Sequence, residues 1–292
     1  MTPSFSATAD PSLAKPRVAH LRKLMMAQNL EAYLVPHADE HQNEFLPPSA
    51  ERLKWLTGFS GSAGLAVIGL KKAALFIDGR YTLQVQTECD PSLFEFLGPS
   101  DKKPTEWILS HCKKGATIGF DPWLHTINEI TKMTSELAAK GLKLKAVSKN
   151  LVDTAWRKER PPPPLNPVVL HPIDKAGQKG EKKIAELQAL LSQNNEHSVL
   201  LTALDSIAWL FNIRGSDIAH TPVALAFAYV PAKGKPELFI EPLKISKAEK
   251  KKLEEVVSIV PHKKMKERLN SLRRTQKTVR IDTNSAPFAL KR

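Results

Sequence analysis

One pentapeptide of this 292-residue chain has the spacing of a metal-binding motif. His37-Ala-Asp-Glu-His41 fits H-x-x-E-H, which holds zinc when both histidines lie on one face of a helix and a third ligand completes the site. Here the pentapeptide directly follows Pro36, at the end of an expected strand, and the sequence offers no third ligand. We therefore expect a polar loop that holds no metal. The alternative is a loop that places His41 and Glu44 beside a substrate cleft.

Three glycines, Gly58, Gly61 and Gly64, punctuate the next stretch, GFSGSAG. Their G-x-x-G-x-x-G spacing differs from the G-x-G-x-x-G of dinucleotide sites, and the turn precedes a strand instead of following one. Ser60 and Ser62 are each one position away from the serine of a G-x-S-x-G nucleophile turn. We expect these glycines to allow close backbone packing.

Arg80 lies in a third stretch, Asp78-Gly79-Arg80-Tyr81, which follows an expected strand. A glycine at a strand end lets the backbone bend sharply and present a long cationic side chain to a cleft. A guanidinium can grip a peptide carbonyl or carboxylate through paired hydrogen bonds. Arg80 is therefore a candidate substrate-binding residue, and an internal ion pair with Asp78 is the alternative.

Two oppositely charged residues, Arg214 and Asp217, lie in an expected loop over residues 212–217. They could form an ion pair that closes this loop, or they could face a neighbouring domain. We consider both as candidate domain-interface residues.

The elements that would carry these residues alternate between helices and strands. From Arg17 onward, Val18, Leu21 and Met25 recur at helical spacing, and a short apolar strand follows at residues 32–35. The runs 65–70 and 73–77, joined by a turn, are typical of paired strands. This order predicts an α/β layer. Later helices are expected at 105–112 and 128–140, and later strands at 116–120 and 142–147.

Four consecutive prolines, Pro161 to Pro164, divide the chain. Such a run favours a stiff extended segment and is expected to be a linker between domains. Beyond it the pattern repeats: helix 180–193, strand 198–201, helix 205–211 capped by Asp205, a glycine-containing loop and a hairpin over 223–230 and 238–240. We therefore expect a disordered tail at 1–16, a first α/β domain at 17–160, a linker at 161–166 and a similar second α/β domain at 167–292.

Charge, apolar runs and cysteine content argue against nucleic-acid binding, a membrane-spanning segment and secretion. The net charge is +13, and the stretch from Lys244 to Arg280 holds much of the excess. Its lysines alternate with apolar residues at helical spacing, which favours the solvated face of amphipathic helices over specific nucleic-acid binding. No apolar run approaches the length of a membrane span, and the N-terminus has no secretory pattern. Two cysteines without metal-type spacing favour free thiols and a cytoplasmic location.

The order of these motifs resembles a known family. TGFSGSAG, a hairpin and DGRYTLQ are similar to the first domain of the three-domain aminopeptidase P (Xaa-Pro aminopeptidase) family. LDSIAWLFNIRGSD over residues 204–217 looks like the opening of that family's second domain, and PHADEHQNEFL agrees as well. The resemblance implies two creatinase N-terminal-like α/β domains, each a mixed sheet flanked by helices.

The resemblance also implies a function for the assembly to which these domains belong. That family uses two divalent metals, manganese or zinc, held by Asp, His and Glu of a C-terminal peptidase domain that would begin beyond Arg292. It releases an N-terminal residue that precedes proline. The chain is thus expected to be a non-catalytic portion, inactive alone, that shapes the cleft. Its expected partners are an absent or separately encoded peptidase domain, a second copy in a homodimer, and peptides with proline at position two. The alternative is a stand-alone peptide- or protein-binding scaffold that has lost its peptidase domain.

Overall fold

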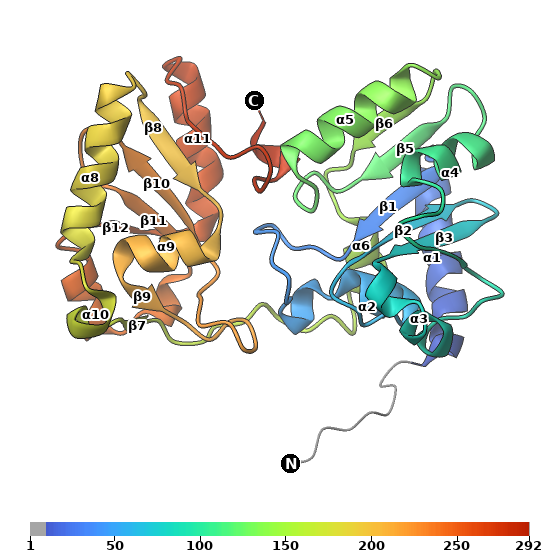
Figure 1. Cartoon of the computed structure of the whole chain (residues 1–292), viewed down its shortest axis with the longest axis horizontal. Coiled ribbons are helices and arrows are strands. Elements are labelled where there is room, and N and C mark those ends of the chain that lie inside the picture. The colour runs from blue at the N-terminus through green and yellow to red at the C-terminus, as the bar shows by residue number, and fades with distance from the viewer. Residues whose placement is uncertain (1–9, 292) are drawn as a thin grey trace, which may run out of the picture. The chain divides into compact units, whose positions relative to one another are not determined.

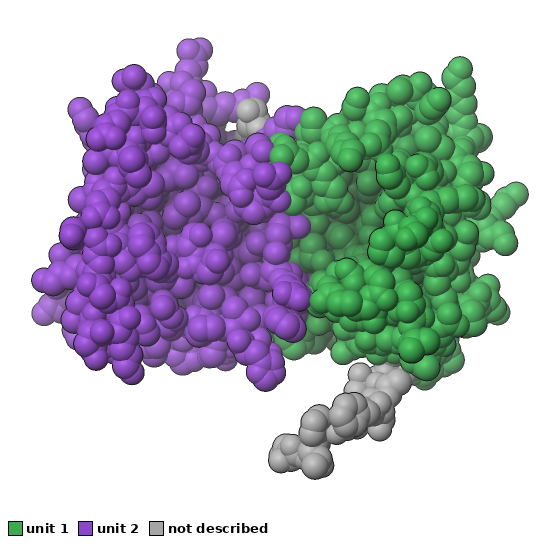
Figure 2. All heavy atoms as spheres, viewed as in Figure 1, with its two compact units in different colours: residues 1–39, 48–162 green, residues 40–47, 163–292 purple. Residues whose placement is uncertain are grey.

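The computed structural model describes residues 10–291 and divides into two compact units (Figures 1 and 2). One unit contains residues 1–39 and 48–162, and the other contains residues 40–47 and 163–292. The short segment 40–47 therefore belongs to the second unit, although its neighbours in the sequence on both sides belong to the first.

The expectation of a disordered tail at 1–16 is wrong for residues 10–16; residues 1–9 lie outside the described part of the chain. Asp10 accepts a hydrogen bond from the Ser12 backbone amide and begins the 3₁₀ helix η1 (Pro11–Leu13). The helix α1 (Ala14–Ala27) continues from it. Ala14 is buried in the core, so this start is held by packing as well as by the aspartate cap.

The first unit is built on a six-stranded mixed sheet in the order β4-β3-β2-β1-β5-β6. The middle strands β1, β2 and β3 pair antiparallel, whereas β4, β5 and β6 join by parallel pairing. The predicted hairpin is confirmed, with Ala66 opposite Leu75. The strands are β1 (Ala32–Pro36), β2 (Gly64–Gly69), β3 (Ala73–Ile77), β4 (Glu95–Leu97), β5 (Thr117–Phe120) and β6 (Lys143–Ala146).

Helices cover both faces of this sheet (Figure 1). On one face, α1, α2, α3 and α6 enclose the apolar core with the side chains of Tyr33, Val35 and Leu75. The helices α4 and α5 contact one another, add nothing to that core and cover the opposite face. These helices are α2 (Arg52–Thr57), α3 (Gln84–Glu88), α4 (Pro104–His111), α5 (Ile127–Ala138) and α6 (Leu151–Trp156).

Residues 161–168 lie between the last helix of the first unit and the first strand of the second, and they form neither helix nor strand. The four prolines cannot donate to a ladder, so this stretch remains extended.

The second unit has a four-stranded sheet in the order β12-β11-β10-β8 and a two-stranded sheet of β7 and β9. The helices α8, α9 and α10 share one core with β10 and β11. The helix α11 lies outside that core, where Arg268 stacks on Tyr229 and pairs with Glu237 at 2.6 Å. The strands are β7 (Val169–Leu170), β8 (Ser198–Leu201), β9 (Ile213–Arg214), β10 (Phe227–Pro231), β11 (Glu237–Ile240) and β12 (Ser258–Pro261); the helices are α7 (Ile173–Ala176), α8 (Gly180–Gln193), α9 (Leu204–Phe211), α10 (Lys247–Leu253) and α11 (Met265–Arg274).

The predicted similarity of the two domains is confirmed by strand order and direction. The strands β8, β10, β11 and β12 repeat the pairing of β1, β2, β3 and β4: two antiparallel pairs followed by one parallel pair. The place of β5 beside β1 is taken in the second unit by Arg280, which forms a parallel bridge with Val199. Its amide donates to Ser198 at 2.8 Å, and its carbonyl accepts from Leu200 at 3.0 Å.

Three local predictions differ from the structure. The strand β12 follows the lysine-rich helix α10 and was not foreseen. The expected strand 223–230 begins only at Phe227, since Pro222 and Val223 instead bond to Gly215 and Asp217. Asp205 is not the cap of α9; it lies in the first turn and accepts from the Ser206 amide.

Candidate functional site

The glycine turn of the first unit is held against a buried aromatic ring and a buried carboxylate. Phe59 is fully buried, and a Cβ placed on Gly61 would lie 2.4 Å from its ring. A Cβ on Gly64 would lie 2.9 Å from the same ring. The prediction that these glycines serve close packing is therefore confirmed for Gly61 and Gly64, whereas Gly58 ends α2 in the left-handed conformation with φ of 89°.

Glu88 of α3 binds this turn through both carboxylate oxygens. One oxygen accepts from the Ser60 amide at 2.8 Å, and the other accepts from the Ser60 hydroxyl at 2.5 Å. Gln84, one helical turn earlier, donates to the same serine and to Glu88. Sequence reasoning missed Glu88; an acidic residue four positions after a glutamine in the helix that follows DGRY was the available signal.

The DGRY turn lies beside the glycine turn. The hydroxyls of Tyr81 and Ser62 are 2.8 Å apart, and the Tyr81 ring meets Phe59 edge to face at a centroid distance of 5.5 Å. The glycine turn and the DGRY turn therefore form one structure.

Arg80 is held at the end of β3 by Asp78. The Arg80 guanidinium Nε donates to Asp78 at 2.8 Å, and Asp78 also accepts from the Arg80 amide and so begins η3 (Gly79–Tyr81). These hydrogen bonds hold the pKa of the Asp78 carboxyl below its usual value. The Arg80 side chain is 62% exposed. The ion pair with Asp78 left open by the sequence is present, and it still leaves the guanidinium accessible to solvent.

Arg214 and Asp217 do not pair with one another, so that part of the structural interpretation is wrong. Among the described residues, Asp217 pairs with Lys244 at 2.6 Å, and both side chains are almost completely buried. Asp217 also accepts from the backbone amides of Asn166 and Leu225. It therefore joins the end of the extended linker, the segment just before β10 and the 3₁₀ helix η4 (Pro242–Lys244).

Arg214 instead binds backbone carbonyls near the end of α9. Its guanidinium donates to Ala208 at 3.2 Å and to Ile213 at 2.8 Å. Cations are stabilised beside the free carbonyls at a helix C-terminus. The position of Arg214 is thus explained by the helix that precedes it, and Lys244 is the partner of Asp217 that sequence reasoning missed. A lone lysine between apolar residues in PLKI was the only signal for it.

The two histidines of the H-x-x-E-H pattern do not lie on a helix. Residues 37–47 form a loop, as predicted, and the pentapeptide passes from the first unit into the second at residue 40. His41 is only 5% exposed. Its Nδ1 lies 3.0 Å from the Thr202 carbonyl, which can only accept, so this nitrogen carries the proton. Its ring also packs on Phe227 at 4.4 Å.

Metal ligands and membrane spans were sought over residues 10–291. Within that range no three His, Cys, Asp or Glu side chains gather in a way that could hold a metal ion. No helix in the same range combines the length and the apolar character that crossing a bilayer requires.

Sequence models of the creatinase/prolidase N-terminal domain match this chain twice. One matches residues 17–154, and a second matches residues 159–292. The chain belongs to the creatinase/prolidase N-terminal domain family. The DGRY turn lies in the first of these two domains, and the Asp217–Lys244 pair lies in the second.

Curated relatives of these two creatinase/prolidase N-terminal domains are described as probable Xaa-Pro aminopeptidase P. The relative from Coccidioides posadasii (strain C735) is 36% identical over 270 residues, which are 92% of this chain and 41% of the relative. The relative from Neosartorya fischeri is 39% identical over 233 residues, 79% of this chain and 35% of the relative. The chain thus spans about two fifths of the length of these relatives and corresponds to their N-terminal part.

A solved structure shows the same pair of creatinase/prolidase N-terminal domains. The X-prolyl aminopeptidase of Caenorhabditis elegans, described as a cytosolic enzyme with a di-nuclear active site, matches with a TM-score of 0.88 at 29% identity. The match covers 95% of this chain and 48% of the C. elegans chain.

Proposed function

We propose that this chain acts as the non-catalytic N-terminal portion of an Xaa-Pro aminopeptidase, with the peptidase chemistry supplied by a C-terminal domain of the kind its relatives carry. One observation carries the proposal: nearly the whole chain matches less than half of an X-prolyl aminopeptidase, with a TM-score of 0.88. The curated relatives support it with the same proportion of coverage.

In this proposal, the substrate is a peptide with proline at its second position. Bonds before proline resist ordinary peptidases because proline fixes φ and has no N–H. Two divalent metals, manganese or zinc, would activate water in the peptidase domain. The two N-terminal domains would form part of the wall of the substrate cleft, so that only peptides with a free N-terminus can bind in it.

Arg80 is the residue of this chain that we assign to the substrate. Its side chain is largely exposed, and the hydrogen bond that its Nε donates to Asp78 fixes its direction. A fixed guanidinium loses little entropy when it binds a carbonyl or carboxylate. His41 is a weaker candidate, because its contacts with Thr202 and Phe227 bury it. The contacts of Arg214 and Asp217 support a role inside the second domain rather than at a domain interface.

The same proposal covers domain boundaries, assembly and location. We propose domains at 17–160 and 167–292 joined by the proline linker, a homodimer as the assembled form, and a cytoplasmic location. The C. elegans relative, described as cytosolic, supports the location. Nucleic acid and membranes are not proposed as partners.

A domain fusion tests this function. This chain would be joined to the C-terminal part of the Coccidioides posadasii relative and assayed with manganese or zinc on an Xaa-Pro-Xaa peptide. We expect the fusion to release the N-terminal residue at least tenfold faster than the C-terminal part alone. Equal rates would show that these domains add nothing to the reaction, and would favour the stand-alone scaffold.

A further inference from the structure

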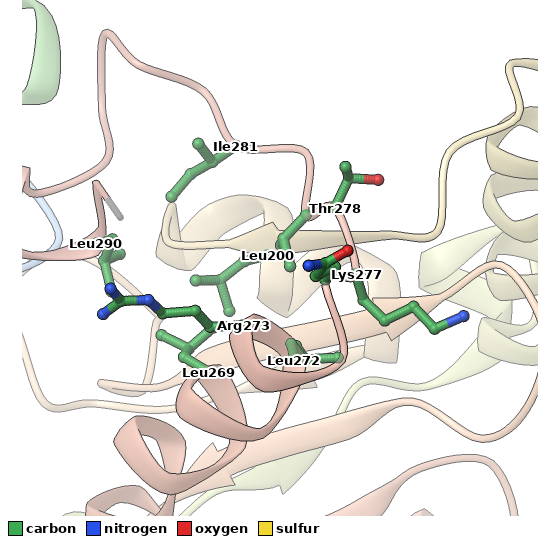
Figure 3. Close-up of a pocket in the computed structure, with 10 residues that line it drawn as sticks. Leu200, Leu269, Leu272, Arg273, Lys277, Thr278, Ile281 and Leu290 are labelled. Carbon is green, nitrogen blue, oxygen red and sulfur yellow. The ribbon is translucent and has the colours of Figure 1, made fainter.

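A cavity of about 410 Å³ lies within the second unit, between α11 and the chain that follows it (Figure 3). Its volume lies in the range of small-molecule sites. Leu200 of β8 and Leu272 of α11 are buried in its wall. Its apolar lining consists of Leu200, Leu269, Leu272, Val279, Ile281 and Leu290.

Comparison of the two domains explains why space remains here. In the first unit, the helix between β4 and β5 is α4, and it carries the fully buried Trp107, whose indole N–H donates to Glu95. In the second unit, α11 takes the same place, between β12 and the segment that bridges to β8 at Arg280. Its sequence, MKERLNSLRR, has no aromatic residue. Leucines therefore line a space that no large ring fills.

The charged residues of the lining are all cationic, and Gln276 and Thr278 are its neutral polar residues. Arg273 and Lys277 line the cavity, their side chains are exposed, and no acidic residue lines it. Figure 3 shows Arg273 extending beside Leu290. Neither cation has an acidic partner among residues 10–291, whereas Lys264 and Arg268 of the same region pair with Glu267 and Glu237. An apolar floor with the Arg273 guanidinium at its edge is complementary to an amphipathic anion.

We propose that this cavity binds an aliphatic carboxylate, with the hydrocarbon chain on the leucine-lined floor and the carboxylate at Arg273, since the Lys277 side chain points away from the leucines (Figure 3). Burial of the chain supplies most of the affinity. The Arg273 guanidinium can hold the carboxylate through two hydrogen bonds. The site lies within one unit and does not depend on the proposed peptidase role.

Binding to the full chain by titration calorimetry tests this site. Octanoate, nonanoate and decanoate would be used below their micelle concentrations. We expect one molecule per chain, with the affinity rising about threefold to fourfold for each added methylene. Decan-1-ol should bind about twofold to fivefold more weakly than decanoate, because one exposed cation contributes modestly. Affinity independent of chain length, or equal for alcohol and carboxylate, would overturn the proposal.

Matched variants locate the binding. Arg273→Gln should weaken decanoate binding about twofold to fivefold. Arg274→Gln removes the same charge from an exposed position of α11 that does not line the cavity, and it should leave the affinity unchanged. Leu269→Trp, which puts a ring into the cavity, should weaken binding at least tenfold. Equal losses in both charge variants, or undiminished binding by the tryptophan variant, would place the carboxylate elsewhere.

Discussion

The carboxylate of Asp217 lies 2.6 Å from the ammonium of Lys244, and both side chains are buried inside the second domain. The pair joins two segments 27 residues apart, and the backbone amides of Asn166 and Leu225 complete the hydrogen bonding of the carboxylate. A buried ion pair adds little net stability when it replaces apolar packing, but removal of one partner leaves a charge buried alone.

Lys244→Met should therefore lower the free energy of unfolding of the second domain by about 3–5 kcal/mol. Urea denaturation followed by far-UV circular dichroism measures this. Asp217→Asn combined with Lys244→Met should recover part of the loss, since no unpaired charge remains. Lys250→Met, which breaks an exposed pair with Glu254, should cost less than about 1 kcal/mol. A similar small loss for Lys244→Met would refute the role of the buried pair.

The hydrogen bonds that Ser60 of the glycine turn donates to Glu88 give a second prediction. Glu88→Gln keeps the size of the side chain but replaces one accepting oxygen with a donor, which cannot accept from Ser60. We expect a loss of about 1–3 kcal/mol in the stability of the first domain. Glu255→Gln, at an exposed position, is the control and should change stability by less than about 0.5 kcal/mol. Equal stability of the two variants would mean that the turn is held without Glu88.

Several of these relationships were accessible from the sequence, and others were not. The glycine turn and the DGRY turn were predicted because their residue types restrict the backbone locally. The partners Glu88 and Lys244 were not, because each lies 27 or 28 residues from the group it binds. Opposite charges at Arg214 and Asp217 suggested a pair, but Arg214 binds the carbonyls of Ala208 and Ile213, and Asp217 binds the buried Lys244. Nothing in the local pattern indicated that residues 40–47 belong to the second unit.

Both cysteines are expected to be unreactive in the folded chain. Burial raises the pKa of the Cys89 thiol to about 12 and that of Cys112 to about 11. At pH 8 the thiolate that reacts with disulfide reagents is then at most about 0.1% of either group. Labelling with a chromogenic disulfide should be slow in buffer and fast in urea. Rapid labelling of one thiol in buffer would show that its surroundings open readily.

The direction of these pKa shifts also fixes a dependence of stability on pH. The unfolded chain loses its thiol protons at lower pH than the folded chain, so alkaline pH favours unfolding. The contribution of the two thiols is present below about pH 9 and is lost as the pH rises toward 12. A Cys89→Ala variant should show a smaller decline in stability between pH 8 and pH 10 than the unchanged chain.

Arg80 provides a prediction about substrate. In the fusion with a peptidase domain, Arg80→Ala should lower kcat/KM for an Xaa-Pro-Xaa peptide about tenfold, which corresponds to about 1.4 kcal/mol. The melting temperature should stay nearly unchanged, because the side chain is largely exposed. Arg80→Lys should restore only part of the activity, since an ammonium lacks the planar pair of donors. A large fall in melting temperature with a proportionate loss of activity would make Arg80 structural.

The most direct test of the account is an activity assay on the purified chain alone. It would be incubated with manganese or zinc and an Xaa-Pro-Xaa peptide, and bound metal would be counted by elemental analysis. We expect no release of the N-terminal residue and fewer than about 0.1 metal ions per chain, because a two-metal peptidase requires a cluster of carboxylates and histidine. Turnover that a chelator abolishes, with about two metal ions bound per chain, would contradict the account.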